Sequence, residues 1–468
     1  MKARMPKVRG RGPRLDNADR LRRAVGWVLN DRMFADLALH GNVSWVACEL
    51  VTLALAWVWS PAAQLTSAFD EAREIAVIMF GRAAVTSYQG LLGALITYTK
   101  QLRPILWKRL QELMQQFDAA HVRVGEWFPL AVDGSRVSAP RTVSNERAFA
   151  APRYGQSRRA RSRVRWKNKR RRSKQVITSA RPQIWITLLW HMGLKMPWCW
   201  RLGPSTASER DHLTDMLRHE KLPENTLICG DAGFVGNSLW REILGAGHSF
   251  LIRVGGNVRL LRKLGSMRQY DDLVYFWPDQ VARQKQPPLV LRLIEFPSTR
   301  GRVYLLTNVL SQRCLSDSQA AKLYRLRWGV ELQFRTFKQT FGRDELRSRT
   351  AEAALAELEW SLFGLWMIAL LAVKEQLSIN SIPERCSMAL AIGIIQRALR
   401  NWSQTSADDL SLRRLLRRAV KDSYSRHTSK KSRHRRNFKD QPTTQPPEIV
   451  IATSSQRHAY RQLQRRAA

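Results

Sequence analysis

The chain contains few acidic residues and few cysteines. Aspartate and glutamate number 38 among 468 residues, against 78 lysines and arginines, so the formal net charge is +40. This excess is far beyond what solubility requires and predicts a polyanionic partner, with nucleic acid favoured over an anionic membrane. The five cysteines are scattered and form no Cys-x2-Cys pair. Neither a disulfide framework nor a zinc site is therefore expected.

Long uninterrupted apolar runs are also lacking. The N-terminus, MKARMPKVRGRGPRLD, is basic without an apolar core, which argues against a secretory signal. Val43–Trp59 carries Glu49 at its middle, and Trp360–Val373 spans 14 residues, whereas a membrane helix needs about 20. Both stretches are therefore expected to be buried helices of a protein in a reducing cytoplasm.

Residues 24–120 have the apolar spacing of helices. Ser67–Phe80 is expected to end at Gly81, with Ala83–Lys100 following after a tight turn and Pro104–Phe117 forming a further helix. Two helices across a glycine turn are either a helix-turn-helix unit or plain helix packing, and the pattern leaves both open.

From Phe128 the pattern changes to short apolar runs typical of buried strands. Five such runs are interleaved with two helices, the first opened by the capping box Ser208-Glu-Arg-Asp211. The expected strands are Phe128–Asp133, Ile184–His191, Trp198–Leu202, Thr226–Gly230 and Ser249–Val254, and the helices are Ser208–His219 and Asn237–Leu244. Strand, strand, strand, helix, strand, helix, strand is the order of a ribonuclease H-like α/β core.

A segment with further strand-like runs, residues 258–300, interrupts this core. It contains Val274–Trp277 and Leu289–Glu295, and Val303–Asn308 follows. Beyond it the pattern predicts one helix over Leu323–Gln339.

On that expected helix, Tyr324, Arg327, Glu331 and Lys338 fall within an arc of about 60° at about 100° per residue. The apolar residues of the helix occupy the neighbouring face. A carboxylate in such a stripe can hold a metal ion, and the cations beside it can hold phosphate oxygens.

This spacing resembles the signature of DDE transposases of bacterial insertion sequences, in the branch with Tyr-x2-Arg-x3-Glu-x6-Lys. All four positions match. The sequence AVDGS around Asp133 resembles the first-aspartate motif of that family, and ICGDAGF around Asp231 resembles the second. The order Asp, Asp, Glu is also the family's, and the resemblance covers about residues 125–350.

The resemblance implies that Asp133, Asp231 and Glu331 are catalytic and hold Mg²⁺ or Mn²⁺, with two ions per active site. Alone, an aspartate at a strand end is more often a turn former or a cap. Three converging carboxylates, however, need cations between them to stay charged. Two such ions would activate the attacking water or 3′-hydroxyl and stabilise the leaving 3′-oxygen.

The other signature residues, Tyr324, Arg327 and Lys338, are expected to bind DNA phosphates. The alternative is ordinary surface charge with a half-buried tyrosine.

A second basic feature lies between the first two core strands, in a loop expected over residues 152–175. Its Arg153–Lys174 run contains 12 Arg or Lys and no acid, with Trp166 as a stacking surface. The run is either a DNA clamp or an idle solvated loop. The candidate clamp residues are Arg158, Arg159, Arg161, Arg163, Arg165, Trp166, Lys167, Lys169, Arg170, Arg171, Arg172 and Lys174.

The expected fold is α/β: a ribonuclease H-like mixed-sheet core interrupted by a β-rich insertion, with helical N-terminal and C-terminal regions. The expected parts are a basic arm and helical DNA-end-binding region (1–124), the core (125–350) with its insertion (258–300), a helical region (351–410) and a basic disordered tail (411–468).

The implied activity is cut-and-paste transposition. The protein would bind the terminal inverted repeats of its element, cleave the strands, with a DNA hairpin route open, and join the 3′-hydroxyls to target DNA. A nuclease or resolvase without strand transfer, a non-catalytic DNA-binding descendant and an RNA-binding scaffold are the alternatives, and the carboxylates argue against the last two. The implied partners are double-stranded DNA and a second copy on paired ends, with no membrane, in the bacterial cytoplasm at the nucleoid.

Overall fold

The computed structural model describes residues 17–151, 181–265, 272–298, 301–400, 411–421 and 445–467. The chain divides into two compact units: unit 1 is Met1–Leu113 with Leu346–Lys421, and unit 2 is Met114–Glu345 with Asp422–Ala468. The N-terminal helical region and the helical region after residue 346 therefore form one unit, a pairing that no local pattern predicts. The candidate DNA clamp lies outside the described residues.

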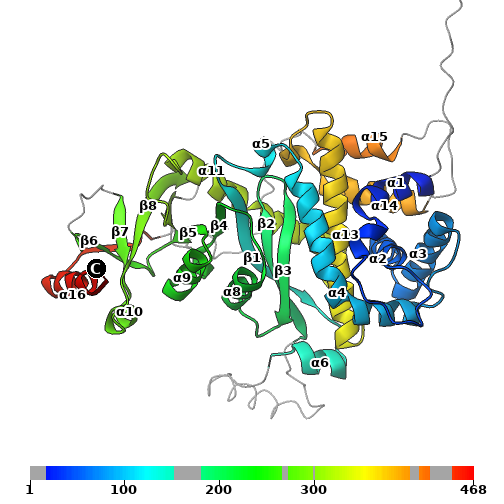
Figure 1. Cartoon of the computed structure of the whole chain (residues 1–468), viewed down its shortest axis with the longest axis horizontal. Helices are drawn as coiled ribbons and strands as arrows, with labels where there is room; N and C mark the ends of the chain where they lie inside the picture. Colours follow the sequence, from blue (N-terminus) through cyan, green and yellow to red (C-terminus); the bar gives the residue numbers. More distant parts are fainter. Residues whose placement is uncertain are drawn as a thin grey trace, which may run out of the picture. The chain divides into compact units, whose positions relative to one another are not determined.

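Unit 2 is built on one ten-stranded mixed sheet (Figure 1). Its spatial order is β10-β6-β7-β8-β9-β5-β4-β1-β2-β3. The strands are β1 Phe128–Ser138, β2 Gln183–His191, β3 Met196–Pro204, β4 Thr226–Gly230, β5 Ser249–Val254, β6 Arg259–Arg262, β7 Leu273–Phe276, β8 Leu289–Ser298, β9 Gly301–Thr307 and β10 Glu448–Ile451.

The half of the sheet from β3 to β5 has the ribonuclease H-like arrangement that the sequence predicts. Strands β1, β2 and β3 form an antiparallel meander, and β1, β4 and β5 run parallel. Helix α8 (Glu209–His219) connects β3 to β4, helix α9 (Asn237–Gly245) connects β4 to β5, and the two helices contact each other. The expected mixed α/β core is confirmed.

Apolar burial explains why these segments form strands. The first five residues of β1 are fully buried, as are Trp198 and Trp200 of β3. β1 was expected to end at Asp133, and this boundary is wrong. The strand continues to Ser138 because β2 pairs with it as far as Ser138↔Gln183.

The end of β2 is fixed by a buried histidine. His191 is fully buried; its Nε2 lies 2.9 Å from the carbonyl oxygen of Val122, and the Leu194 N–H donates to its Nδ1 at 2.9 Å. Burial lowers the pKa of His191 to about 3. The imidazole is therefore neutral, with its proton on Nε2.

The β-rich insertion extends the same sheet. Strand β9 pairs antiparallel with β5, and β8, β7 and β6 follow outward. At its edge, β10 from near the C-terminus pairs in parallel with β6. Helix α16 (Ser454–Ala467) lies beside these strands (Figure 1), and its Tyr460 contacts the rings of Tyr275 and Trp277.

The expected disordered tail from residue 411 is therefore wrong for two segments. Residues 411–421 contain helix α15 (Leu412–Arg417), and residues 445–467 contain β10 and α16. Residues 422–444 lie outside the described residues. Apolar contacts explain the order, because Leu412 and Leu416 are buried and Tyr460 joins a small apolar cluster.

The signature segment is three helical pieces rather than the single helix expected. They are α11 (Asp317–Arg327), α12 (Gly329–Arg335) and a π-helical turn over Thr336–Thr340. In the π turn the Phe341 N–H donates to the Thr336 carbonyl, and both Phe337 and Phe341 are buried. The additional residue in this turn changes the direction of Lys338 from the one an ideal helix predicts. The remaining helices in the described part of unit 2 are α5 Ala119–Val122, α6 Val143–Phe149, η2 Ala232–Phe234 and α10 Asp279–Arg283.

Unit 1 is helical. Its elements are α1 Asn17–Val28, η1 Asp31–Phe34, α2 Ala47–Trp59, α3 Leu65–Phe80, most of α4 Tyr88–Gln115, α13 Ala351–Leu377, η4 Pro383–Arg385, α14 Met388–Arg400 and α15. Helix α3 ends as expected at Gly81, whose φ is +74°. The two helices expected on either side of Pro104 are one helix, α4, which continues through the proline.

Helix α13 is the core of unit 1. By length and composition it is apolar enough to cross a membrane, but its apolar window is entirely buried within the protein. Gly364 admits the close approach of α2, because a methyl group there would lie 2.7 Å from the Val58 side chain, and Trp59 Nε1 donates to the Gly364 carbonyl at 2.9 Å. In α2, the buried Glu49 is paired with Arg82 at 2.8 Å.

Candidate active site

Asp133 and Asp231 lie on neighbouring parallel strands. β1 and β4 pair as far as Ala131↔Cys229, and β4 ends at Gly230. Continuing this register by two residues places Asp133 beside Asp231, and adjacent strands are about 4.8 Å apart. The two carboxylates that the sequence singles out are therefore brought together by strand pairing.

Short hydrogen bonds orient both aspartates. The Gly134 N–H donates to Oδ1 of Asp133 at 3.0 Å. Asp231 is the N-cap of the 3-10 turn η2, and the Gly233 N–H donates to its Oδ1 at 2.7 Å. Each bond uses one oxygen of its carboxylate, which leaves the second oxygen to face a ligand.

Glu331 reaches this region from α12, whose position depends on a glycine. A methyl group at Gly329 would lie 2.1 Å from the Trp190 ring of β2, and Trp190 is itself buried. Only glycine lets the helix approach the sheet this closely. The Glu331 side chain is 40% exposed, and Arg327 Nη2 donates to its Oε1 at 3.1 Å.

The buried arginine Arg327 is the cation of the site. Its side chain is 4% exposed, and its charge interacts with those of Asp133, Asp231 and Glu331. Its Nε has no hydrogen-bond partner among the described residues. A buried donor without a partner is costly, and an anionic group entering the site would satisfy it.

The pKa of Asp133 reflects its burial and the charges around it. Burial raises its pKa to about 6, and the charges of Asp231 and Glu331 add to the rise. The Arg327 guanidinium and the Gly134 N–H oppose it. One arginine therefore does not balance the carboxylates around it.

A fourth carboxylate, Glu209, lies in the same place, although the sequence did not single it out. It is the first residue of α8, and its Oε1 is 2.3 Å from the position that a methyl group on Gly134 would take. Burial raises the pKa of Glu209 to about 7, and the charges of Asp133 and Asp231 add to the rise. The only local signal was an acid directly after the capping residue Ser208, a common first-turn feature.

The cluster suits a hard divalent cation. Its donors are all carboxylate oxygens, as Mg²⁺ and Mn²⁺ prefer, and Gly134 leaves the space that the Glu209 carboxylate enters. As they stand, no three Asp, Glu, His or Cys side chains of the described segments lie close enough to enclose an ion. The Glu331 carboxylate is hydrogen-bonded to Arg327, and its side chain is 40% exposed.

The remaining signature residues are less exposed than expected. Tyr324 is 4% exposed with its ring edge against Phe296, and burial raises its pKa while Arg327 opposes the rise. Lys338 is half-buried in the π turn; burial lowers its pKa, and Asp344 opposes the change. Tyr324 therefore lies where it supports Arg327.

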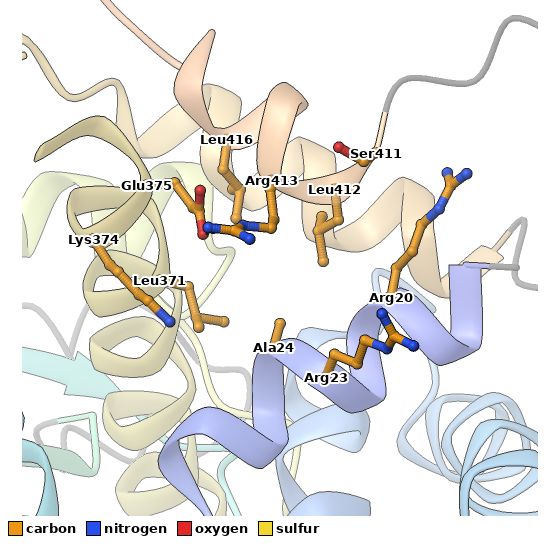
Figure 2. Close-up of a pocket in the computed structure, with 10 residues that line it drawn as sticks. All are labelled: Arg20, Arg23, Ala24, Leu371, Lys374, Glu375, Ser411, Leu412, Arg413 and Leu416. Atoms are coloured by element: carbon orange, nitrogen blue, oxygen red, sulfur yellow. Dashed lines mark hydrogen bonds and ion pairs between the residues drawn. The ribbon is translucent and has the colours of Figure 1, made fainter. Parts of the chain in front are cut away.

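Unit 1 contains a basic cavity of about 450 Å³ (Figure 2). Four of its lining side chains are cations, from α1, the end of α13 and the start of α15. Glu375 is the one carboxylate among the lining residues, and Arg413 donates to it at 2.9 Å. The cations are Arg20, Arg23, Lys374 and Arg413, and the apolar lining residues include Leu371, beside Lys374, and Leu416, beside Arg413 (Figure 2).

Comparison with known proteins gives a sequence relative and a weak structural likeness. Transposase InsG for insertion sequence element IS4 of Escherichia coli (strain K12) is 28% identical over 211 residues, a match that spans 42% of this chain and 46% of that protein. A solved structure of a piggyBac transposase synaptic complex with hairpin DNA shows a weak likeness, with a TM-score of 0.39 and 11% identity over 87% of this chain and 84% of that one.

The family comparison covers the part of the chain that carries the carboxylates. Residues 129–367 match the Transposase DDE domain family, which is 239 of 468 residues and so just over half of the chain. The matched range begins in β1, four residues before Asp133, and extends past Glu331 into α13. The chain belongs to the DDE transposase family.

Proposed function

We propose that this chain is a cut-and-paste transposase of the branch with the Tyr-x2-Arg-x3-Glu-x6-Lys signature. Membership of the family implies DNA transposition, DNA binding, and strand cleavage and transfer with divalent metal ions. The observation that most directly supports an active enzyme is the β1–β4 register that places Asp133 beside Asp231, with the buried Arg327 donating to Glu331. A DNA-binding descendant would have no use for three carboxylates around one buried cation.

In this proposal Asp133, Asp231 and Glu331 hold two Mg²⁺ or Mn²⁺ ions. When bound, such ions activate the attacking water or 3′-hydroxyl and stabilise the leaving oxygen of an in-line displacement. The protein's part is to hold its oxygens in place. Gly134 and Gly233 fix the two aspartates, and the helix that carries Glu331 is fixed by its packing on β2.

Arg327 and Lys338 neutralise phosphate charge in this scheme, and Tyr324 positions Arg327. Lys338→Arg should then retain part of the cleavage activity, because arginine keeps the positive charge. Lys338→Glu should retain none, because glutamate reverses the charge. Cleavage of a labelled element end by each purified variant measures this. Equal activity of the two variants would show that Lys338 does not face DNA.

The proposed partner is double-stranded DNA at the inverted-repeat ends and at the target, held by a homodimer when two ends are paired. The net charge of +40 supports a polyanionic partner. The basic run 153–174 and the cavity of unit 1 are the candidate contacts. The proposed location is the bacterial cytoplasm, at the nucleoid.

Isosteric variants test the active site. Asp133→Asn, Asp231→Asn and Glu331→Gln should each abolish cleavage of a labelled end in Mg²⁺ or Mn²⁺ while end binding in a gel-shift assay persists. Ca²⁺ should support binding without efficient cleavage, because it prefers more ligands at longer distances. Cleavage at an unchanged rate in EDTA would contradict a metal-dependent mechanism.

Strand transfer separates this proposal from a nuclease or resolvase on the same fold. A labelled 3′-end incubated with the wild-type protein and a supercoiled plasmid should appear covalently joined to the plasmid. Cleaved ends that are never joined would favour the nuclease. Inverted repeats of tens of base pairs flanking the gene would support transposition independently.

A further inference from the structure

The carboxylate of Glu209 is packed between the two glycines that accompany the aspartates. A methyl group on Gly134 would lie 2.3 Å from Oε1 and 2.8 Å from the carboxyl carbon of Glu209. A methyl group on Gly233 would lie 4.0 Å from Oε2 of the same side chain. The two oxygens of Glu209 therefore face the residue after Asp133 and the turn after Asp231.

A further contact holds α8 against that turn. The side chain of Arg210 donates from Nε to the carbonyl oxygen of Gly233 at 2.7 Å. This bond ties the first turn of α8 to the turn that follows Asp231, so the direction of Glu209 towards the aspartates is set by the fold.

We infer that Glu209 is a fourth carboxylate of the catalytic metal site, holding a divalent cation together with Asp133 and Asp231. The inference rests on the proposed function, because it takes the two aspartates as metal ligands. It adds a residue from outside the Asp, Asp, Glu set, contributed by a different helix.

A simple helix-start role does not account for this arrangement. An acid in the first turn stabilises a helix through its dipole by facing the amide groups. Asp211 is also in the first turn of α8, is exposed, and is available for that role. Glu209 instead directs its carboxylate to the sheet, into the space left by Gly134.

Charge balance favours a cation at this point. Among the described residues, the buried Arg327 acts on Asp133, Asp231 and Glu331, whereas Arg136 and Arg210 act on Glu209 from exposed positions. Negative charges held together in a partly buried site are strongly unfavourable unless cations lie between them. Divalent cations would offset the negative charge that Arg327 leaves unbalanced.

Direct measurement of metal binding tests the inference without relying on activity. Mn²⁺ would be titrated into the full-length protein without DNA, and free Mn²⁺ followed by electron paramagnetic resonance. Glu209→Gln should weaken Mn²⁺ binding by at least about 10-fold, because loss of a group that only orients a metal ligand already costs about 10–100-fold. The matched control is Asp211→Asn, which removes the same charge from the same helical turn and should leave binding unchanged.

Gly134→Ala provides a second, independent variant. Its methyl group would displace the Glu209 carboxylate while leaving the glutamate in the chain, so Mn²⁺ binding should fall as it does in Glu209→Gln. Thermal unfolding in EDTA confirms that each variant is folded. Mn²⁺ binding by Glu209→Gln equal to that of Asp211→Asn would overturn the inference.

Asp133→Asn separates that failure from failure of the proposed function. If Asp133→Asn loses Mn²⁺ binding and Glu209→Gln does not, only the role of Glu209 is refuted. If neither variant loses Mn²⁺ binding, the proposed metal site itself is wrong.

Discussion

Replacing Gly329 with alanine should move the start of α12 away from β2 and carry the Glu331 carboxylate with it. The added methyl group would lie 2.1 Å from the Trp190 ring, whereas ordinary contact begins at 3.4 Å. The helix and the ring must therefore separate by about 1.3 Å. Trp190 is 2% exposed and has little room to yield. A displacement of about 1 Å at a catalytic group can cost about 100-fold in rate.

The same substitution should change stability much less. Alanine gains about 1 kcal/mol over glycine in helix propensity, and overpacking a core contact costs about 1–3 kcal/mol. The free energy of unfolding should therefore fall by about 0–2 kcal/mol. A 100-fold loss of cleavage rate corresponds to about 2.7 kcal/mol in the activation barrier. A large loss of activity with a small loss of stability is the pattern that identifies a displaced helix.

Single-turnover cleavage of a labelled element end, urea denaturation and a gel shift measure the three quantities. Gly245→Ala, in α9 of the same unit, is the matched control, because a methyl group there meets nothing within 4 Å. Adding Trp190→Phe should relieve Gly329→Ala, since phenylalanine is shorter than tryptophan. Cleavage by Gly329→Ala within about threefold of wild type, or no relief by Trp190→Phe, would refute the reasoning.

Three further predictions concern stability and DNA binding. Burial lowers the pKa of His191 to about 3, so the contribution of the neutral imidazole to the free energy of unfolding is complete above about pH 6.5 and falls by about 2 kcal/mol at pH 5. The urea midpoints at pH 7.5 and pH 5 should therefore differ less in His191→Gln than in the wild type, and an unchanged difference would contradict this. Deleting residues 153–174 should flatten the dependence of DNA affinity on salt, by about 0.9 in log–log slope per lost phosphate contact, and an unchanged slope would make the run an idle loop. Arg20→Ala with Arg23→Ala should weaken DNA binding in a gel shift, whereas Arg22→Ala, outside the cavity, should not; equal effects would assign the loss to general charge.

The sequence predicted the core strands well because their signal is local. A buried parallel strand such as β4 is a short apolar run with a turn at its end, and Thr226–Gly230 was found with its observed bounds. The extent of β1 was not predictable in this way. Its residues after Asp133 are less apolar and are held in the strand by pairing with β2, a partner about fifty residues along the chain.

The signature segment shows how tertiary packing changes a local pattern. Helical spacing predicts one helix, because Phe334 and Phe337 repeat at an interval of three. The structure instead widens the last turn so that Phe341 is also buried beside Phe337. Where Lys338 points is therefore decided by how the phenylalanines pack, which a helical wheel does not include.

Long-range pairings were outside the reach of the sequence. β10 and β6 are almost 190 residues apart, and a strand of four residues, Glu448–Ile451, gives no indication of its partner. The joining of the N-terminal helices to α13, α14 and α15 in one unit is of the same kind. Apolar stripes indicate that a face will be covered, but they do not identify what covers it.

Glu209 shows a different limit, in which the local pattern is explained completely and a second role goes unnoticed. Ser208 and the acids after it account for the start of α8, so the sequence leaves nothing unexplained at that position. Yet the side chain turns to the sheet because Gly134 leaves it space. That space is a property of β1, and the sequence places the two residues 75 positions apart. Glycines beside an aspartate are commonly interpreted as freedom for the backbone; here Gly134 also makes room for a second carboxylate, and both uses are lost together if a methyl group is added.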